Sequence, residues 1–247
     1  EAKALKPEKK QSAKELLGYM FQNKYTVPLI IAFVVNWFAT MLFSSATIYY
    51  ARDIMGNGDF MKILNNARSL PAMFLLVIGV VPLFATKFGK RKALVFAFIS
   101  HLVSGVILFV AGQNLILLVL GQVLRSVGSA FGSTMLMAMV SDTADYINLK
   151  NNIDISGMTS SIVSFGMKVG MGLGSAVLAW TLAWGGYSGE AAKNGLAQSA
   201  STMLAEKACF IYIPTACFLL LLFICNTLDV DKKVKELRAS LEAKTNA

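Results

Sequence analysis

The sequence predicts an all-α membrane protein with six transmembrane helices. Hydrophobic residues make up 55% of the chain and charged residues only 15%, whereas soluble domains carry about 25% charged residues. Six apolar segments stand out, and each is near or above the roughly 20 residues that a helix needs to cross the hydrocarbon core. They are residues 28–50, 69–86, 93–111, 114–140, 158–184 and 207–226.

The positions of Lys and Arg orient these helices. If the N-terminus is cytoplasmic, sixteen of the 23 Lys and Arg residues fall inside and five fall outside. Membrane proteins usually show this excess of basic residues in cytoplasmic loops. We therefore expect a multi-pass protein of the plasma (inner) membrane with both termini in the cytoplasm. The net charge of +9 then reflects topology, and the expected partner is the lipid bilayer rather than nucleic acid.

Two amphipathic flanks border the six segments. We expect a basic cytoplasmic segment over residues 1–27, a transmembrane bundle over 28–226 and a cytoplasmic tail over 227–247. Apolar residues recur at helical spacing in both flanks, so each is predicted to lie on the inner leaflet or to cap the bundle. These residues are Leu16, Leu17, Met20 and Phe21, and Val230, Val234, Leu237 and Leu241. The Gly-, Ser- and Ala-rich stretch at 185–206 is predicted to be a flexible outer connection without a site.

Lys168 lies near the middle of the fifth apolar segment. A charge at this depth costs at least about 2.5–3.5 kcal/mol on insertion scales. Ten helical residues separate Lys168 from the cytoplasmic edge, a rise of about 15 Å, which is more than a lysine side chain comfortably spans. We therefore expect Lys168 to face a polar cavity or a partner charge, as in transporters and channels. The alternative is that it only pairs with a buried carbonyl or carboxylate and fixes the packing.

The fifth segment has two different faces. Gly166, Gly170 and Gly174 form a small-residue row of the kind that lets two helix backbones approach closely. Lys168 points away from this row at about 100° per residue, whereas four small or polar residues lie nearer to its side. These are Ser161, Ser164, Gly172 and Ser175.

Two other segments carry polar candidates. In the fourth, a stripe of Gly121, Gly128 and Gly132 accompanies Arg125, which is predicted to line a cavity or to pair with a carbonyl near a helix break. In the first, hydroxyl and amide groups form a stripe beside an aromatic ring, an arrangement that suits a sugar. The possible cavity residues are Asn36, Trp37, Thr40, Ser44, Ser133, Ser161 and Ser164.

Enzyme signatures are missing from the sequence. It contains neither HExxH nor GxSxG, nor a Walker motif, and its single histidine, His101, is expected to bond a neighbouring helix or to relay a proton. The three cysteines, Cys209, Cys217 and Cys225, form no CxxC pair and are predicted to be packed or lipid-facing. We expect no enzyme activity, no resident cofactor and no metal.

The stretch SDTADYINLKNNID follows the fourth segment and is predicted to be a cytoplasmic loop. It holds Asp142, Asp145 and Asp154. These acidic groups could pair with Lys or Arg elsewhere and lock an inward gate, or they could simply be solvated.

Four stretches carry a resemblance to a known family: ELLGYMFQNKYTVPLI, KFGKRK, SDTADY and SFGMKVGMGLGSA. Together they resemble the glycoside–pentoside–hexuronide:cation symporters, the melibiose-carrier family of the major facilitator superfamily. The resemblance covers essentially the whole chain and matches the second six-helix half of a twelve-helix transporter.

The resemblance implies secondary active transport of a sugar or glycoside coupled to H+ or Na+ by alternating access. Lys168 matches a position important for transport and coupling, with Arg125 as a second candidate, and Asp142, Asp145 and Tyr146 match the family's cytoplasmic gate. The acidic cation ligands are expected in an N-terminal six-helix half. Because none of the six apolar segments contains an acidic residue, the counter-charge of Lys168 is expected there too.

The chain departs from the family pattern near Asp154, where a basic residue is usual, and at Thr86, where an aspartate is frequent. The ion pairs of the gate are therefore expected to differ. Two other readings stay open. One is a stand-alone six-helix protein that oligomerises into a pore or carrier, and the other is a non-transporting membrane scaffold.

Overall fold

Every regular element is a helix within residues 12–245, the part of the chain that this computed structural model describes. In chain order the elements are α1 (Ala13–Gln22), α2 (Thr26–Tyr49), η1 (Tyr50–Ile54), α3 (Phe60–Val77), α4 (Val80–Phe88), α5 (Lys90–Ala111), α6 (Leu115–Asn151), α7 (Ser156–Trp184), α8 (Gly189–Lys193), α9 (Ala200–Lys207), η2 (Ala208–Tyr212), α10 (Ile213–Ile224), η3 (Cys225–Thr227) and α11 (Val230–Thr245). The basic residues Lys3, Lys6, Lys9 and Lys10 of the predicted N-terminal segment lie outside the described residues.

Helices cover all six predicted apolar segments, but the second segment is not a straight helix. Five helices are long and apolar enough to cross a membrane, and α3 with α4 meets this test only as a pair that bends by 64°. The bend falls at Gly79, whose φ of 75° ends α3 because few other residues tolerate this conformation. The predicted bounds of 69–86 are wrong at their start, because α3 begins at Phe60 with a polar first half that a search for apolar runs misses.

Two helices continue further than the apolar runs indicate. α6 extends to Asn151, so Asp142 and Asp145 lie on a helix and not in a loop. The last span begins at Ala200 instead of residue 207, which places Glu206 within it. The expectation that no acidic residue lies within a span is therefore wrong. Hydrophobicity alone does not show that a carboxyl group is buried in a helical turn.

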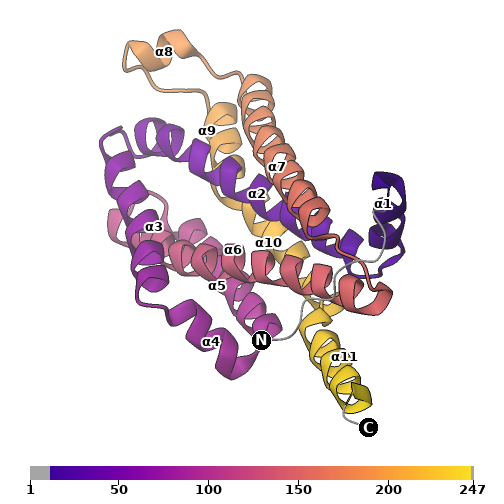
Figure 1. The fold of residues 1–247 in the computed structure, drawn as a ribbon. Coiled ribbons are helices and arrows are strands. Elements are labelled where there is room, and N and C mark those ends of the chain that lie inside the picture. Colours follow the sequence, from indigo (N-terminus) through magenta and orange to yellow (C-terminus); the bar gives the residue numbers. More distant parts are fainter. Residues whose placement is uncertain (1–11, 246–247) are drawn as a thin grey trace.

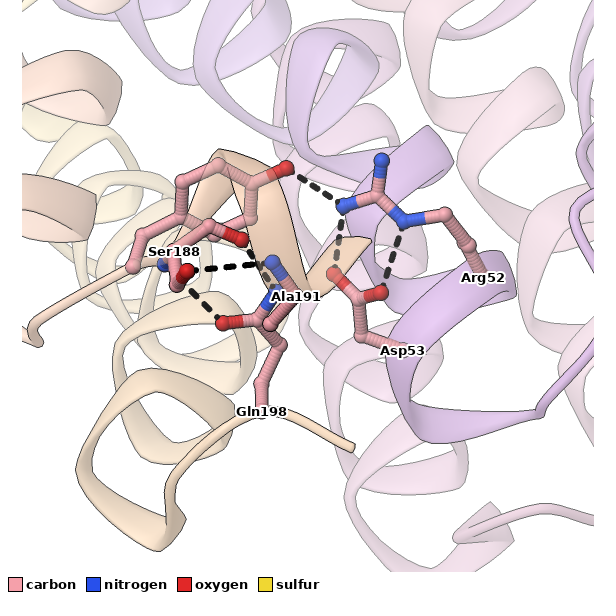
Figure 2. A network of polar contacts seen from close by, with 6 residues as sticks. Arg52, Asp53, Ser188, Ala191 and Gln198 are labelled. Carbon is pink, nitrogen blue, oxygen red and sulfur yellow. Dashed lines mark hydrogen bonds and ion pairs between the residues drawn. The ribbon is translucent and has the colours of Figure 1, made fainter. Parts of the chain in front are cut away.

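The segment 185–206 is also more ordered than predicted. It contains α8, and the Ser188 N–H donates to Gln198 Oε1 at 3.1 Å while Gln198 Nε2 donates to the Ser188 carbonyl at 2.9 Å (Figure 2). Gln198 is buried. Because the amide of Gln198 replaces water as the partner of the Ser188 backbone, this part of the connection has a fixed conformation and is not a flexible linker.

The helices pack in two groups that share one aromatic core. Figure 1 shows α2 and α7 side by side, next to α3, α5 and α6, with α8 and α11 at opposite ends of the bundle. Phe43, Phe98 and Phe218 meet between α2, α5 and α10. Cys209 and Cys225 are buried and Cys217 is half-buried, so these thiols are packed as predicted.

The contact between α2 and α7 depends on the predicted glycine row. A Cβ at Gly170 would lie 2.5 Å from the carbonyl oxygen of Val34, and one at Gly174 would lie 2.8 Å from that of Phe38. Larger residues at these positions would separate the two backbones. The row therefore lets α7 lie directly on α2 and fixes which face of α7 points away from it.

Both flanking helices cap the bundle. Met20 of α1 is buried against Ile147, Ile153 and Ile155, and α1 begins with a capping box between Ser12 and Glu15. In α11, Val230 and Val234 belong to the main core and Leu237 is half-buried, whereas the side chain of Leu241 lies outside the described residues. Leu17 and Phe21 stay exposed.

A matched pair of substitutions tests the α2–α7 contact. Gly170→Ala adds a methyl group where the Val34 backbone leaves no room, and overpacking of this kind typically costs about 1–3 kcal/mol. Gly172→Ala makes the same change on the same helix, but no atom lies within 4 Å of its Cβ position. We expect the thermal midpoint of the purified protein to fall for Gly170→Ala and to stay unchanged or rise for Gly172→Ala. Equal midpoints would contradict the contact.

Candidate functional site

The open face of α7 carries Lys168. α7 is the least buried of the five long apolar helices, because one face packs on α2 while the other has few neighbours. Lys168 is exposed on that second face and lines a hollow of about 440 Å³ with Ser160, Ser161, Ser164 and Phe165. The prediction that Lys168 points away from the glycine row is confirmed.

A second hollow continues this polar surface toward the end of the bundle that holds α11. It has a volume of about 260 Å³ between α6 and α7 and shares Ser160 and Ser164 with the first. Ser141 and Asp145 line its other side. A strip of hydroxyl groups thus connects Lys168 with Asp145 of α6.

The serines of this strip have hydrogen-bonding capacity left. Ser160 Oγ donates to the Ser156 carbonyl and Ser161 Oγ to the Gly157 carbonyl, each at 3.0 Å. A hydroxyl that donates once still has two lone pairs that accept. The strip therefore suits a ligand that offers many O–H or N–H donors, and Lys168 adds a cationic donor. Within residues 12–245, the Lys168 ammonium forms no ion pair or hydrogen bond. The alternative that Lys168 only fixes the packing therefore lacks the carbonyl or carboxylate partner that it requires in this part of the chain.

The polar residues predicted on the first helix lie elsewhere. Asn36 is buried with its Oδ1 facing Gly132 of α6, and Trp37 lies against Gly170 on the closed face of α7. Thr40 and Ser44 are half-buried, and Ser133 donates to the Ser129 carbonyl within α6. The structure does not bring these residues together with Ser161, Ser164 and Lys168 in one hollow. Their place in a substrate cavity stays a prediction.

Arg125 follows the second of its two predicted alternatives. It is buried, and its Nη2 donates to the Phe210 carbonyl at 2.7 Å. This carbonyl lacks its usual α-helical donor four residues on, because that residue is Pro214, which has no N–H. The chain adopts the π-helical turn η2 at this point. Arg125 thus satisfies a carbonyl at a helix irregularity, as predicted.

A second cation, Arg68, lies beside Arg125 and was not predicted from the sequence. The guanidinium carbons of Arg125 and Arg68 lie 4.6 and 5.8 Å from the centre of the Phe43 ring. The apolar run begins at residue 69 and leaves Arg68 outside the predicted span, yet Arg68 lies in α3 one turn after the buried Leu64. The spacing of four residues between Leu64 and Arg68 was the signal in the sequence that both could lie on one face of a helix. Arg68 Nε and Arg125 Nη1 are buried without a hydrogen-bond partner in the described chain.

His101 forms no hydrogen bond to a neighbouring helix among the described residues, and its role as a proton relay stays a prediction. Its ring stacks on Phe218 with the centroids 3.7 Å apart, and its edge closes on Gly128 of α6. His101 Nδ1 is buried and unpartnered among the described residues. The predicted bond to a neighbouring helix is therefore wrong, because aromatic stacking holds the ring.

The predicted gate residues lie on α6 and meet basic groups from other elements. Lys90, which starts α5, lies 2.7 Å from Asp142, and Arg238 of α11 lies 2.6 Å from Asp145. Tyr146 packs edge-on against Tyr25 at 5.9 Å. These contacts join the ends of three helices, as the pairing alternative predicted.

Asp154 does not join this acidic group. The Ser156 N–H donates to its Oδ1 at 2.9 Å at the start of α7. Hydrogen bonds from the backbone and side chain of Ser156 lower the pKa of Asp154. Its function is therefore local, to hold the turn between α6 and α7.

Comparison with known proteins points to one class. The family model described as MFS/sugar transport protein matches residues 1–232. The Isoprimeverose transporter of Lactiplantibacillus pentosus is 27% identical over 222 residues, which are 88% of this chain and 45% of that protein.

Two further relatives come from enteric bacteria. The Glucuronide carrier protein homolog of Escherichia coli K12 is 22% identical over 67% of this chain and 36% of its own length. The Putative sulfoquinovose importer of Salmonella typhimurium is 25% identical over 72% and 37%. The chain thus spans less than half the length of these relatives. All three are membrane transporters, in agreement with the expectation that the protein is not an enzyme.

A double-mutant cycle tests the reason for burying Arg125. Arg125→Met should destabilise the protein by about 1–3 kcal/mol, because it leaves a buried carbonyl without a donor. Pro214→Ala restores a backbone N–H, so the cost of Arg125→Met should be smaller in that background. Denaturation midpoints of the four proteins give the coupling. Strict additivity would contradict the role assigned to Pro214.

Proposed function

Because this chain belongs to the MFS/sugar transport protein family, we propose that it forms the second six-helix half of a transporter for a sugar or glycoside. The cargo moves with a co-transported H+ or Na+ by alternating access. The observation that carries the proposal is the exposed strip of serines around Lys168 on a membrane-spanning helix.

The polar face of α7 needs a covering surface or water. A lysine ammonium and several hydroxyls facing lipid would be costly at this depth, yet the glycine row turns them away from the rest of this chain. Another set of helices or an aqueous path must cover them. A first six-helix half supplies both, since binding sites in such transporters lie between the halves near the midplane.

The proposed substrate class rests on the ligand chemistry of the strip and on the relatives. The serine oxygens accept hydrogen bonds and Lys168 donates them, which matches the alternating donors and acceptors of a polyol. The three relatives are named for an isoprimeverose, a glucuronide and a sulfoquinovose cargo, all of them sugars or sugar derivatives. These names support sugars and sugar derivatives as the substrate class.

Coupling follows if Lys168 and the transported cation compete for the same carboxylates. Lys168 is a fixed cation without an acidic partner in the described chain. Carboxylates of a first half would attract it in one bundle arrangement and hold H+ or Na+ in the other. Cation and sugar binding would then each favour one arrangement, which is the requirement for coupled transport.

The ion pairs on α6 serve as an inner gate in this proposal. Lys90–Asp142 and Asp145–Arg238 hold α5, α6 and α11 together at one end of the bundle. The orientation proposed from the basic residues places this end, with both termini, on the cytoplasmic side of the plasma membrane. Breaking these pairs would then favour the state that is open to the cytoplasm.

The function is tested by Lys168→Val in the full-length protein. Cation-driven sugar accumulation in membrane vesicles should fall to the level of empty vesicles, because the competing charge is gone. Lys193→Val removes an exposed lysine from α8 and should leave accumulation unchanged. Near-normal accumulation by Lys168→Val would contradict the proposal, and it would favour a scaffold whose polar faces are dispensable.

A charge exchange tests the gate. Asp142→Lys alone places two ammonium groups together at the end of α5, and uptake should fall as the inner ends separate. Adding Lys90→Asp recreates an ion pair of opposite polarity and should restore most of the uptake. A double variant as impaired as Asp142→Lys alone, at equal expression, would show that the pair is not the gate.

A further inference from the structure

The opposite end of the bundle from the proposed gate holds a polar clamp formed by Arg52, Asp53 and Tyr187. Figure 2 shows its Arg52 and Asp53 facing each other. Arg52 Nε and Nη2 donate to the two carboxylate oxygens of Asp53, each at 2.6 Å. Arg52 Nη2 also donates to the Tyr187 hydroxyl at 2.7 Å. Because η1 continues α2 and Tyr187 follows α7, the clamp joins the ends of these two helices.

Glu206 of α9 adds a second carboxyl group to the clamp. Its side chain lies beside Asp53 and within the field of Arg52, where α9 packs on η1. Glu206 is 0% exposed, and both of its carboxyl oxygens are buried without a hydrogen-bond partner among the described residues. Buried polar groups are nearly always satisfied, so this carboxyl needs a ligand.

The charges of the clamp do not balance. Two carboxyl groups share one guanidinium, and Arg52 already engages both oxygens of Asp53. The Asp53 side chain is only 5% exposed, so water does not compensate the excess negative charge. Two neighbouring carboxylates in a dry site cannot both stay ionised, and one proton resolves the conflict.

The other groups around Glu206 supply no second cation. Cys209 lies one turn further along the chain and near Thr181 of α7, and Tyr187 already bonds Arg52. A metal ion fits less well than a proton. No group of three or more His, Cys, Asp or Glu side chains that could hold a metal occurs in the part of the chain that the structure describes.

We propose that Glu206 binds a proton and shares it with Asp53, so that the clamp between η1, α7 and α9 is a proton-binding site. The protonated Glu206 carboxyl donates to an Asp53 oxygen, and the site then carries one negative charge against one positive charge. Release of the proton leaves an unpaired negative charge between α9 and η1 and loosens the clamp. The site stands on these contacts and does not rest on sugar transport.

The test is infrared spectroscopy of the full-length protein in lipid nanodiscs, with the pH stepped from acid to alkaline. The wild-type protein should show a protonated-carboxyl C=O band that disappears as the pH rises. Glu206→Gln should remove this band. Asp53→Asn should remove it as well, because Arg52 is then available to neutralise an ionised Glu206.

Glu190→Gln is the matched control, since Glu190 is an exposed carboxylate on the neighbouring α8. It should keep the band. An undiminished band in Glu206→Gln, or loss of the band in Glu190→Gln, would overturn the assignment. If Glu206→Gln does not purify, an undiminished band in Asp53→Asn overturns it instead.

Thermal unfolding gives a second readout. A proton held by the folded state alone makes stability fall as the pH rises, so the wild-type midpoint should decrease between acid and alkaline pH. This decrease should be smaller in Glu206→Gln than in Glu190→Gln. Equal pH dependence in the two variants would overturn the proposal.

Discussion

The close backbone contact between α2 and α7 determines the rest of the arrangement. Gly170 and Gly174 allow the two helices to touch at the carbonyls of Val34 and Phe38. Because α7 can bury only this face, its serines and Lys168 are left on the opposite side, away from the core of the chain. The polar strip is thus a consequence of where the glycines lie, and the proposed transport site depends on that contact.

Three ionisable side chains of the membrane-spanning region, Arg125, Glu206 and Lys168, lie in three different environments. Arg125 is satisfied inside the bundle, by a carbonyl that Pro214 deprives of its donor. Glu206 is buried without a hydrogen-bond partner next to Asp53, whose carboxylate already binds Arg52. In our proposal a proton neutralises Glu206. Lys168 faces outward on α7 without an acidic partner within residues 12–245. Of these three side chains, only Lys168 requires a covering surface that this chain does not supply.

Helical periodicity was enough to predict the faces of α7, and the depth of Lys168 was enough to mark it as unusual. The sequence predicted that Arg125 could pair with a carbonyl group near a helix break. It did not predict which carbonyl, because Phe210 lies on a segment far away in the sequence. The bend at Gly79, the position of Arg68 inside α3 and the burial of Glu206 all escaped a search for apolar runs. The positions of Arg68 and Glu206 depend on polar helical turns whose burial is decided by neighbouring helices. The bend depends on the left-handed backbone conformation of Gly79.

The most direct test of the account asks whether the strip around Lys168 meets water and sugar or meets lipid. The measurement is the reaction rate of Ser164→Cys with a membrane-impermeant thiol reagent, in the full-length protein with Cys209, Cys217 and Cys225 replaced by serine or alanine. The account predicts that Ser164→Cys reacts and that a transported sugar slows the reaction. A cysteine that reacts only with a lipid-soluble reagent, unaffected by any sugar, would contradict it.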